Sequence, residues 1–153
     1  MEAKLPAYAV KHIVSDHGPL SDIMKDVRKT PYSYTSKEPE ATHAARGGDV
    51  YVIEVRAENG GRTYALGYMY RAQEKFSLAG GGRWKGEFKF KNSAVPGAGA
   101  HGVYFDSPVL IEHGALREWL ASKQPGMAQI PSHLVPALDT LIADPFNGAK
   151  RFA

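Results

Sequence analysis

The sequence predicts an α+β fold, built on one curved antiparallel sheet or a small β-barrel with short flanking helices. Two long β-rich segments flank the dipeptide Asn59-Gly60, which is suited to the positive φ angles of a hairpin turn. Two segments near the end of the chain carry apolar residues at helical spacing. The 153 residues, 43% of them hydrophobic, are enough for a single domain that spans residues 1–153 and has its own core.

The first half of the chain predicts three strands and one helix. Residues 8–14 are rich in aromatic and β-branched side chains and predict the first strand. Residues 19–27 have apolar side chains at helical spacing and predict a short helix, whereas the polar residues 30–49 predict a loop. Residues 50–56 and 63–75 predict the two strands of the hairpin.

The second half predicts further strands and the two terminal helices. Aromatic and charged residues alternate over residues 84–91, which predicts a strand, and the Gly- and Ala-rich residues 93–102 predict a loop. A strand bent at Pro108 is predicted over residues 103–111. The last elements are a helix over residues 113–122 and a short strand over residues 127–130.

A last helix is predicted over residues 132–143. Ser132 is placed to cap it, and Pro136 falls in the first turn, where a missing N–H costs nothing. Its apolar stripe consists of Leu134, Leu138, Leu141 and Ile142. The tail after about residue 145 is expected to be loose.

Composition excludes several kinds of chemistry. The chain has no cysteine, which excludes disulfides, thiolate metal sites and a cysteine nucleophile. His12, Asp16 and His17 are close in sequence, but neither a helix nor a strand would direct all three at one ion, so we expect no metal and no cofactor. No apolar run is long enough to span a membrane and no signal peptide is evident, so we expect a cytoplasmic protein without a membrane partner.

Positive charge is concentrated beside a tryptophan. The net charge is only +3, but four cations lie close to Trp84 in the segment after a run of three glycines. These cations are candidate phosphate-binding residues: Arg83, Lys85, Lys89 and Lys91. The alternative is an ordinary solvated strand face.

Aromatic residues near these cations predict a place for a nucleic-acid base. A base taken out of its stack is held by aromatic rings and by hydrogen bonds to its edge. The candidate base-binding residues are Trp84, Tyr32, Tyr34, Ser36, Tyr68 and Tyr70. For each aromatic residue the alternative is packing in the core.

Three stretches carry a resemblance to a known family. They are "RGGDVYVIEV" with "YALGYMYRAQEKF", "FDSPVLIEHGALREWL" and "MAQIPSHLVPALDTLIA", and they cover residues 48–75 and 105–143. Their order resembles the PUA-like superfamily, in particular its EVE, YTH and ASCH group. The resemblance implies a PUA-like fold that recognises a modified base of DNA or RNA in an aromatic pocket beside a basic surface. It also implies an alternative, because some small ASCH domains hydrolyse modified nucleosides.

We therefore expect a nucleic-acid-binding module whose partner is DNA or RNA. The ligand within that partner can be a modified base. One alternative is a small hydrolase that acts on a modified nucleoside, for which Thr35, Ser36, Lys37 and Glu38 would supply the required side chains. Another is a protein-interaction adaptor whose aromatic and basic face meets an acidic protein.

Overall fold

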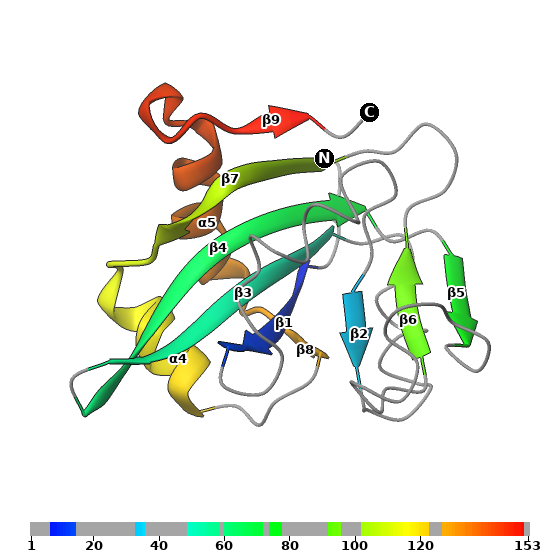
Figure 1. Cartoon of the computed structure of the whole chain (residues 1–153), viewed down its shortest axis with the longest axis horizontal. Helices are drawn as coiled ribbons and strands as arrows, with labels where there is room; N and C mark the ends of the chain where they lie inside the picture. Colours follow the sequence, from blue (N-terminus) through cyan, green and yellow to red (C-terminus); the bar gives the residue numbers. More distant parts are fainter. Residues whose placement is uncertain are drawn as a thin grey trace.

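The fold is built on a six-stranded, open, mixed β-sheet with two helices on one face (Figure 1). The computed structural model describes residues 7–14, 33–35, 49–58, 60–71, 74–77, 92–95, 102–122 and 127–151. In these residues the strands of the large sheet are ordered β8-β1-β3-β4-β7-β9. Their bounds are Ala7–Ile13 (β1), Asp49–Glu58 (β3), Gly61–Arg71 (β4), Gly102–Leu110 (β7), Met127–Gln129 (β8) and Lys150–Arg151 (β9). The α+β class predicted from the sequence is confirmed.

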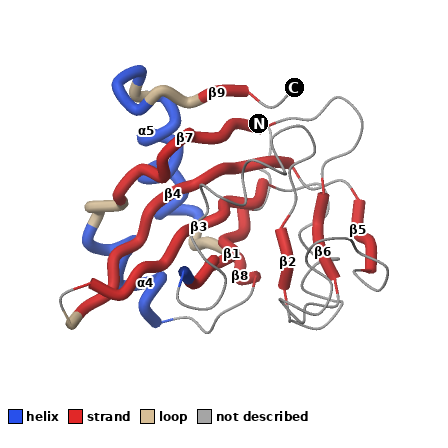
Figure 2. The backbone as a smooth tube through the Cα atoms, viewed as in Figure 1, coloured by secondary structure: helices blue, strands red, loops and turns tan. Residues whose placement is uncertain are grey.

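A smaller sheet lies beside the large one, and β2 of this sheet contacts β1 (Figures 1 and 2). Its three strands are antiparallel and are ordered β2-β6-β5. They are Ser33–Thr35 (β2), Glu74–Ser77 (β5) and Asn92–Val95 (β6). β2 and β6 therefore lie in segments that were predicted as loops, because three- and four-residue strands in polar sequence have no periodic apolar pattern to reveal them.

The prediction of a purely antiparallel sheet is wrong at β1. β1 pairs with β3 in parallel, with Val10 opposite Val52, whereas the other pairs of the large sheet are antiparallel. Parallel strands need a crossover of about a dozen residues or more, and residues 14–48 provide that length. The hairpin between β3 and β4 has no such connection, so its strands must be antiparallel.

The β3–β4 hairpin closes with a two-residue loop, as the Asn-Gly dipeptide predicts. Glu58 pairs with Gly61, and Gly60 has a φ of 79°, which lies in the left-handed region. β4 extends to Arg71 and then breaks, so the single long strand predicted over residues 63–75 is divided between β4 and β5.

Gly60 provides a test of this turn. Gly60→Ala is expected to lower the free energy of unfolding by about 1–2 kcal/mol, because a Cβ disfavours positive φ even where no atom lies near it. Gly114 is a matched control, since it also has open space around it but has no positive φ. Gly114→Ala is expected to be neutral or to stabilise by about 0.4–1 kcal/mol, and urea unfolding of both variants checks the difference. Equal effects of the two substitutions on the free energy of unfolding would contradict a requirement for glycine at the positive φ of residue 60.

A β-bulge in β4 changes which side chains share a face. Val52 pairs with Tyr68 and Ile53 with Leu66, so Gly67 is an extra residue without a partner on β3. Tyr64 and Leu66 therefore face the helices, whereas Tyr68 faces the opposite side. The pairing of β4 with β7 is also interrupted, between Tyr104 and Val109, which agrees with the predicted bend near Pro108.

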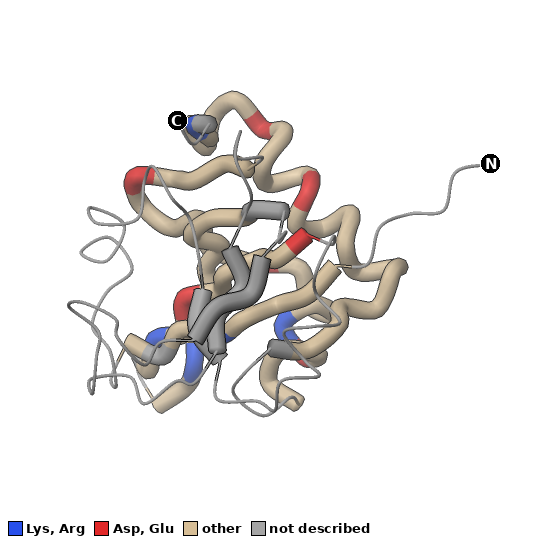
Figure 3. The backbone as a smooth tube through the Cα atoms, turned by 90° about the vertical axis from the view of Figure 1, so that its right-hand side faces the viewer, with Lys and Arg blue, Asp and Glu red and all other residues tan. Residues whose placement is uncertain are grey.

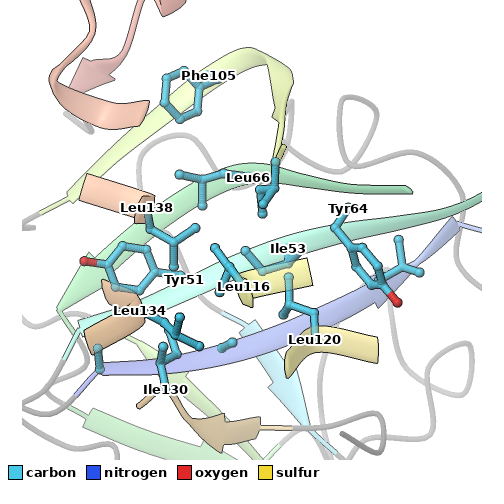
Figure 4. Packing of buried hydrophobic residues seen from close by; sticks show 14 residues of the cluster. Tyr51, Ile53, Tyr64, Leu66, Phe105, Leu116, Leu120, Ile130, Leu134 and Leu138 are labelled. Atoms are coloured by element: carbon cyan, nitrogen blue, oxygen red, sulfur yellow. The ribbon is translucent and has the colours of Figure 1, made fainter. Parts of the chain in front are cut away.

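Two helices cover one face of the large sheet, as predicted (Figure 1). α4 spans Gly114–Ser122 and buries Leu116 and Leu120, and α5 spans Val135–Ala143 and buries Leu138. Figure 4 shows these leucines gathered around Ile53 on β3. Two polar contacts add to this packing: Tyr51 Oη donates to Asp139 Oδ1 of α5 at 2.6 Å, and Lys11 Nζ donates to the Leu120 carbonyl of α4 at 2.8 Å.

The start of α5 and the end of the chain differ from the predictions. Pro136 lies in the first turn of α5, as expected, but Ser132 belongs to a preceding 3-10 turn, Ser132–Leu134, and makes no capping hydrogen bond. The tail predicted to be loose forms a second 3-10 turn, Pro145–Asn147, and then β9, in which Lys150 pairs with Tyr104 of β7. Backbone pairing with β7 holds this segment in place, and it has no apolar periodicity that would have predicted it.

Candidate functional site on the tyrosine face of the sheet

The face of the large sheet opposite α4 and α5 carries tyrosines and a charged pair. Side chains alternate between the two faces of a strand, so the register of the sheet determines which residues share this face. We call it the tyrosine face. It includes Tyr8, Val10, His12, Val50, Val52, Glu54, Arg56, Tyr68 and Tyr104.

The tyrosine face is a second buried layer, separate from the core under the helices. Tyr8 is 8% exposed and Tyr68 is 3% exposed, while Tyr104, which is paired with Tyr68 across β4 and β7, is half-buried. None of the three belongs to the helix-covered cluster. Both faces of the sheet are therefore largely buried, but only this one combines tyrosines with a buried charge.

That charge is Glu54, whose side chain is only 2% exposed. Arg56 lies two residues further along β3, hence on the same face, and its Nε donates to Glu54 Oε1 at 2.5 Å. The Arg56 side chain is 41% exposed, so this ion pair extends from the buried layer to the surface. His12 is the register partner of Glu54 on β1 and is half-buried. Glutamate is almost never fully buried without a partner, and Arg56 is one partner here.

The exposed part of this arrangement offers a polar, flat ligand the guanidinium of Arg56 and the ring of the half-buried Tyr104. A guanidinium can donate paired hydrogen bonds to a base edge, for example to O6 and N7 of guanine. The Glu54 carboxylate holds this guanidinium in one orientation. The tyrosines of the same sheet face supply apolar surface.

Of the base-binding residues predicted from the sequence, Tyr68 is the one whose side chain the structure describes. It lies on a central strand, paired with Val52 on one side and Tyr104 on the other, and its 3% exposure leaves no open ring for stacking. In this structure it is a packing residue. The backbone of Tyr70 pairs with Val50 of β3, and its side chain lies outside the described residues.

The other predicted residues cannot be placed with their side chains. Tyr34 is the middle residue of β2, opposite Ser93 of β6, and only its backbone is described. Figure 3 shows the described Lys and Arg residues in separate short stretches of the backbone. The following lie outside the described residues: Tyr32, Ser36, Arg83, Trp84, Lys85, Lys89 and Lys91, together with Lys37 and Glu38 of the alternative hydrolase site.

Glu54 was not predicted from the sequence, although a signal for it exists. It is the one charged residue in the apolar run of residues 50–55, which alternates between two buried faces. A single acidic residue inside such a run indicates a buried carboxylate with a specific partner. The Arg at position 56, on the same strand face, was the available sequence clue to that partner.

In the described part of the chain, no three His, Asp or Glu side chains are close enough together to hold a metal ion. No helix in that part is both long and apolar enough to cross a membrane. No protein-family model matches the sequence, and no curated protein matches it either. The functional proposal therefore depends on the residues themselves.

Proposed function

We propose that this protein is a nucleic-acid-binding module of the PUA-like type, which holds a base of DNA or RNA against the tyrosine face. The observation that carries the proposal is the ion pair of Glu54 and Arg56 on the tyrosine face, in which a carboxylate with 2% exposure holds the guanidinium of a side chain that is 41% exposed. A flipped base needs both an aromatic surface and a hydrogen-bonding group for its edge. The half-buried Tyr104 and the guanidinium of Arg56, which Glu54 holds and whose side chain is 41% exposed, are the described groups that meet these two needs.

The basic segment of the sequence supplies the second part of the proposal. Arg83, Lys85, Lys89 and Lys91 would neutralise backbone phosphates on either side of the bound base, with Trp84 as a stacking residue among them. A single exposed guanidinium neutralises one phosphate at most. Nearby cations are therefore a physical requirement of this function.

The proposal predicts a salt-dependent affinity. A labelled single strand of DNA or RNA is titrated with the protein between about 50 and 200 mM salt, and log affinity is expected to fall linearly with log salt. Replacing Lys85, Lys89 and Lys91 by Ala removes three phosphate contacts, so the slope is expected to become shallower by about 2. Lys150→Ala is the matched control, because Lys150 is paired with Asp106 and lies outside the basic segment, and it is expected to leave the slope unchanged.

Glu54→Gln tests the base-binding part separately. It keeps the size of the side chain but removes the charge that holds Arg56, so it is expected to change the preference among bases and leave the salt slope unchanged. A protein that binds no single strand at low salt, or whose affinity does not change with salt, would contradict the proposed function.

The buried Glu54 also favours one second candidate, a small hydrolase that acts on a modified nucleoside. Such an enzyme needs a glutamate, a lysine and a Ser or Thr in one pocket. Thr63 is the register partner of Arg56 and so lies on the same face as Glu54, but Lys11 points to the opposite face, where it bonds to α4. The purified protein is incubated with modified nucleosides, and formation of the unmodified nucleoside is measured. Activity that is present in the natural sequence and lost in Glu54→Gln would support the hydrolase over the binding module.

A further inference from the structure

An open groove of about 450 Å³ lies between the hairpin end of β4 and the outer side of α4. Figure 1 shows α4 passing behind this part of the hairpin. The groove is far along β4 from Tyr68 and lies on the other face of the sheet. Its volume is within the range of small-molecule sites, about 300–1,000 Å³. It is lined by Arg62, Tyr64, Gly114, Arg117, Glu118 and Ala121.

The lining residues face the groove because of two simple periodicities. Arg62 and Tyr64 are two apart on β4 and precede the bulge, so both point to the helix-covered face. On α4 the four lining residues have the spacing i, i+3, i+4 and i+7, which places them on one side of the helix. Leu116 and Leu120 are fully packed on the neighbouring side and hold α4 on the sheet, so the groove is formed in advance of any ligand.

The groove collects polar groups that the rest of the described structure does not use. Arg62 and Arg117 are exposed, and neither guanidinium forms an ion pair within the described residues. Tyr64 is only 3% exposed, yet its hydroxyl has no hydrogen-bond partner in the described part of the chain. Figure 4 shows this hydroxyl directed away from the leucines of the core. A buried hydroxyl without a partner lowers stability, so its position at a groove with two arginines that form no ion pair among the described residues indicates a ligand.

The electrostatic character of the groove specifies an anion. Two arginines and one glutamate give the lining a net charge of +1. Gly114 is the first residue of α4, so one end of the groove also lies near the positive end of the helix dipole. Arginine forms paired hydrogen bonds with phosphate oxygens, and a phenol hydroxyl can donate a third. Glu118 repels further negative charge, which disfavours polyphosphates, and it can accept a hydrogen bond from a sugar hydroxyl.

We propose that this groove binds the phosphate monoester of a nucleoside monophosphate or of the 5′ end of a nucleic-acid strand. Arg62 and Arg117 neutralise the phosphate, Tyr64 donates a hydrogen bond to it, and Glu118 limits the ligand to one phosphate. The site does not depend on base binding at the tyrosine face, and none of its lining residues belongs to the basic segment of the sequence at residues 83–91.

Titration calorimetry with the full chain tests the site, with AMP, adenosine and inorganic phosphate as probes. AMP and phosphate are expected to bind and adenosine is not. Arg62→Ala and Arg117→Ala are each expected to weaken AMP binding by about tenfold or more, because each removes a charge-assisted hydrogen bond. Glu118→Gln is expected to strengthen binding, since it removes a negative charge from the lining. Binding of adenosine as tight as that of AMP, or AMP affinity unchanged in both arginine variants, would overturn the proposal.

Tyr64→Phe separates the binding role of the hydroxyl from folding. It keeps the buried ring and removes only the hydroxyl without a partner, so the melting temperature is expected to stay the same or to rise while AMP binding weakens. A clear fall in melting temperature with unchanged AMP affinity would show that the hydroxyl is structural and would overturn its assigned role.

A single strand with and without a 5′-phosphate distinguishes the two sources of the monoester. A preference for the phosphorylated strand that is lost in Arg117→Ala identifies the strand end as the ligand, and AMP binding without such a preference identifies the free nucleotide. Replacement of Lys85, Lys89 and Lys91 by Ala is expected to leave AMP binding unchanged. The proposal for the groove and the proposal for nucleic-acid binding can therefore be contradicted independently of each other.

Discussion

Leu138→Ala is expected to lower the free energy of unfolding by about 2–5 kcal/mol, one of the two largest effects predicted for this protein. Leu138 is fully buried on α5 and packs against the sheet with Ile53 and Leu66. Removing three of its four side-chain carbons loses apolar burial and leaves a cavity that the rigid sheet cannot fill. Urea unfolding, followed by far-UV circular dichroism, measures the change.

Leu141 provides the matched control for this variant. It lies one turn further along α5 and is only partly buried at the edge of the same cluster. Leu141→Ala deletes the same atoms from a more open place, so it is expected to cost less than half as much. Equal costs at the two positions would show that α5 is not docked through Leu138 as described.

Arg56→Ala is expected to lower the free energy of unfolding by about 1–3 kcal/mol, because it removes an ion-pair partner from the buried carboxylate of Glu54. Breaking a fully buried ion pair costs about 3–5 kcal/mol, and the 41% exposure of Arg56 places this pair below that range. Arg62→Ala is the control, because Arg62 is an exposed arginine on the other strand of the same hairpin. It is expected to have little effect on the free energy of unfolding.

A double variant tests whether burial of the charge is the cause. Glu54→Leu combined with Arg56→Met removes both charges and keeps the apolar volume, and such replacements are often neutral or stabilising. The double variant is therefore expected to be more stable than Arg56→Ala alone. A double variant that is less stable than the single one would show that Glu54 has a structural role beyond its pairing with Arg56.

The two predictions also matter for function, because they concern the two faces of one sheet. Leu138 belongs to the helix-covered face, which positions α4, α5 and the groove, whereas Glu54 and Arg56 belong to the tyrosine face. If Arg56→Ala changes base preference while Leu138→Ala changes only stability, the division of the sheet into a packing face and a binding face is supported.

Much of the fold could be predicted from local sequence patterns. The hairpin of β3 and β4 follows from alternation around Asn59-Gly60, and α4 and α5 follow from leucines at helical spacing. The candidate site was less accessible to such reasoning. Glu54 carries no motif, and Arg62, Tyr64 and Arg117 come from a strand and a helix that are separated by β7 and many residues of chain.

By itself, the sequence determined the long strands β3, β4 and β7 and the helices α4 and α5, because their patterns depend on near neighbours along the chain; the short strands β2, β6 and β9 carry no such pattern. Only the tertiary structure decided the parallel pairing of β1, the burial of Glu54 and the division of the β4 tyrosines between two faces. Simple alternation would place Tyr64 and Tyr68 on the same face. The bulge at Gly67 reverses that alternation, and such an irregularity arises from the fit of β4 between β3 and β7, which no local pattern records.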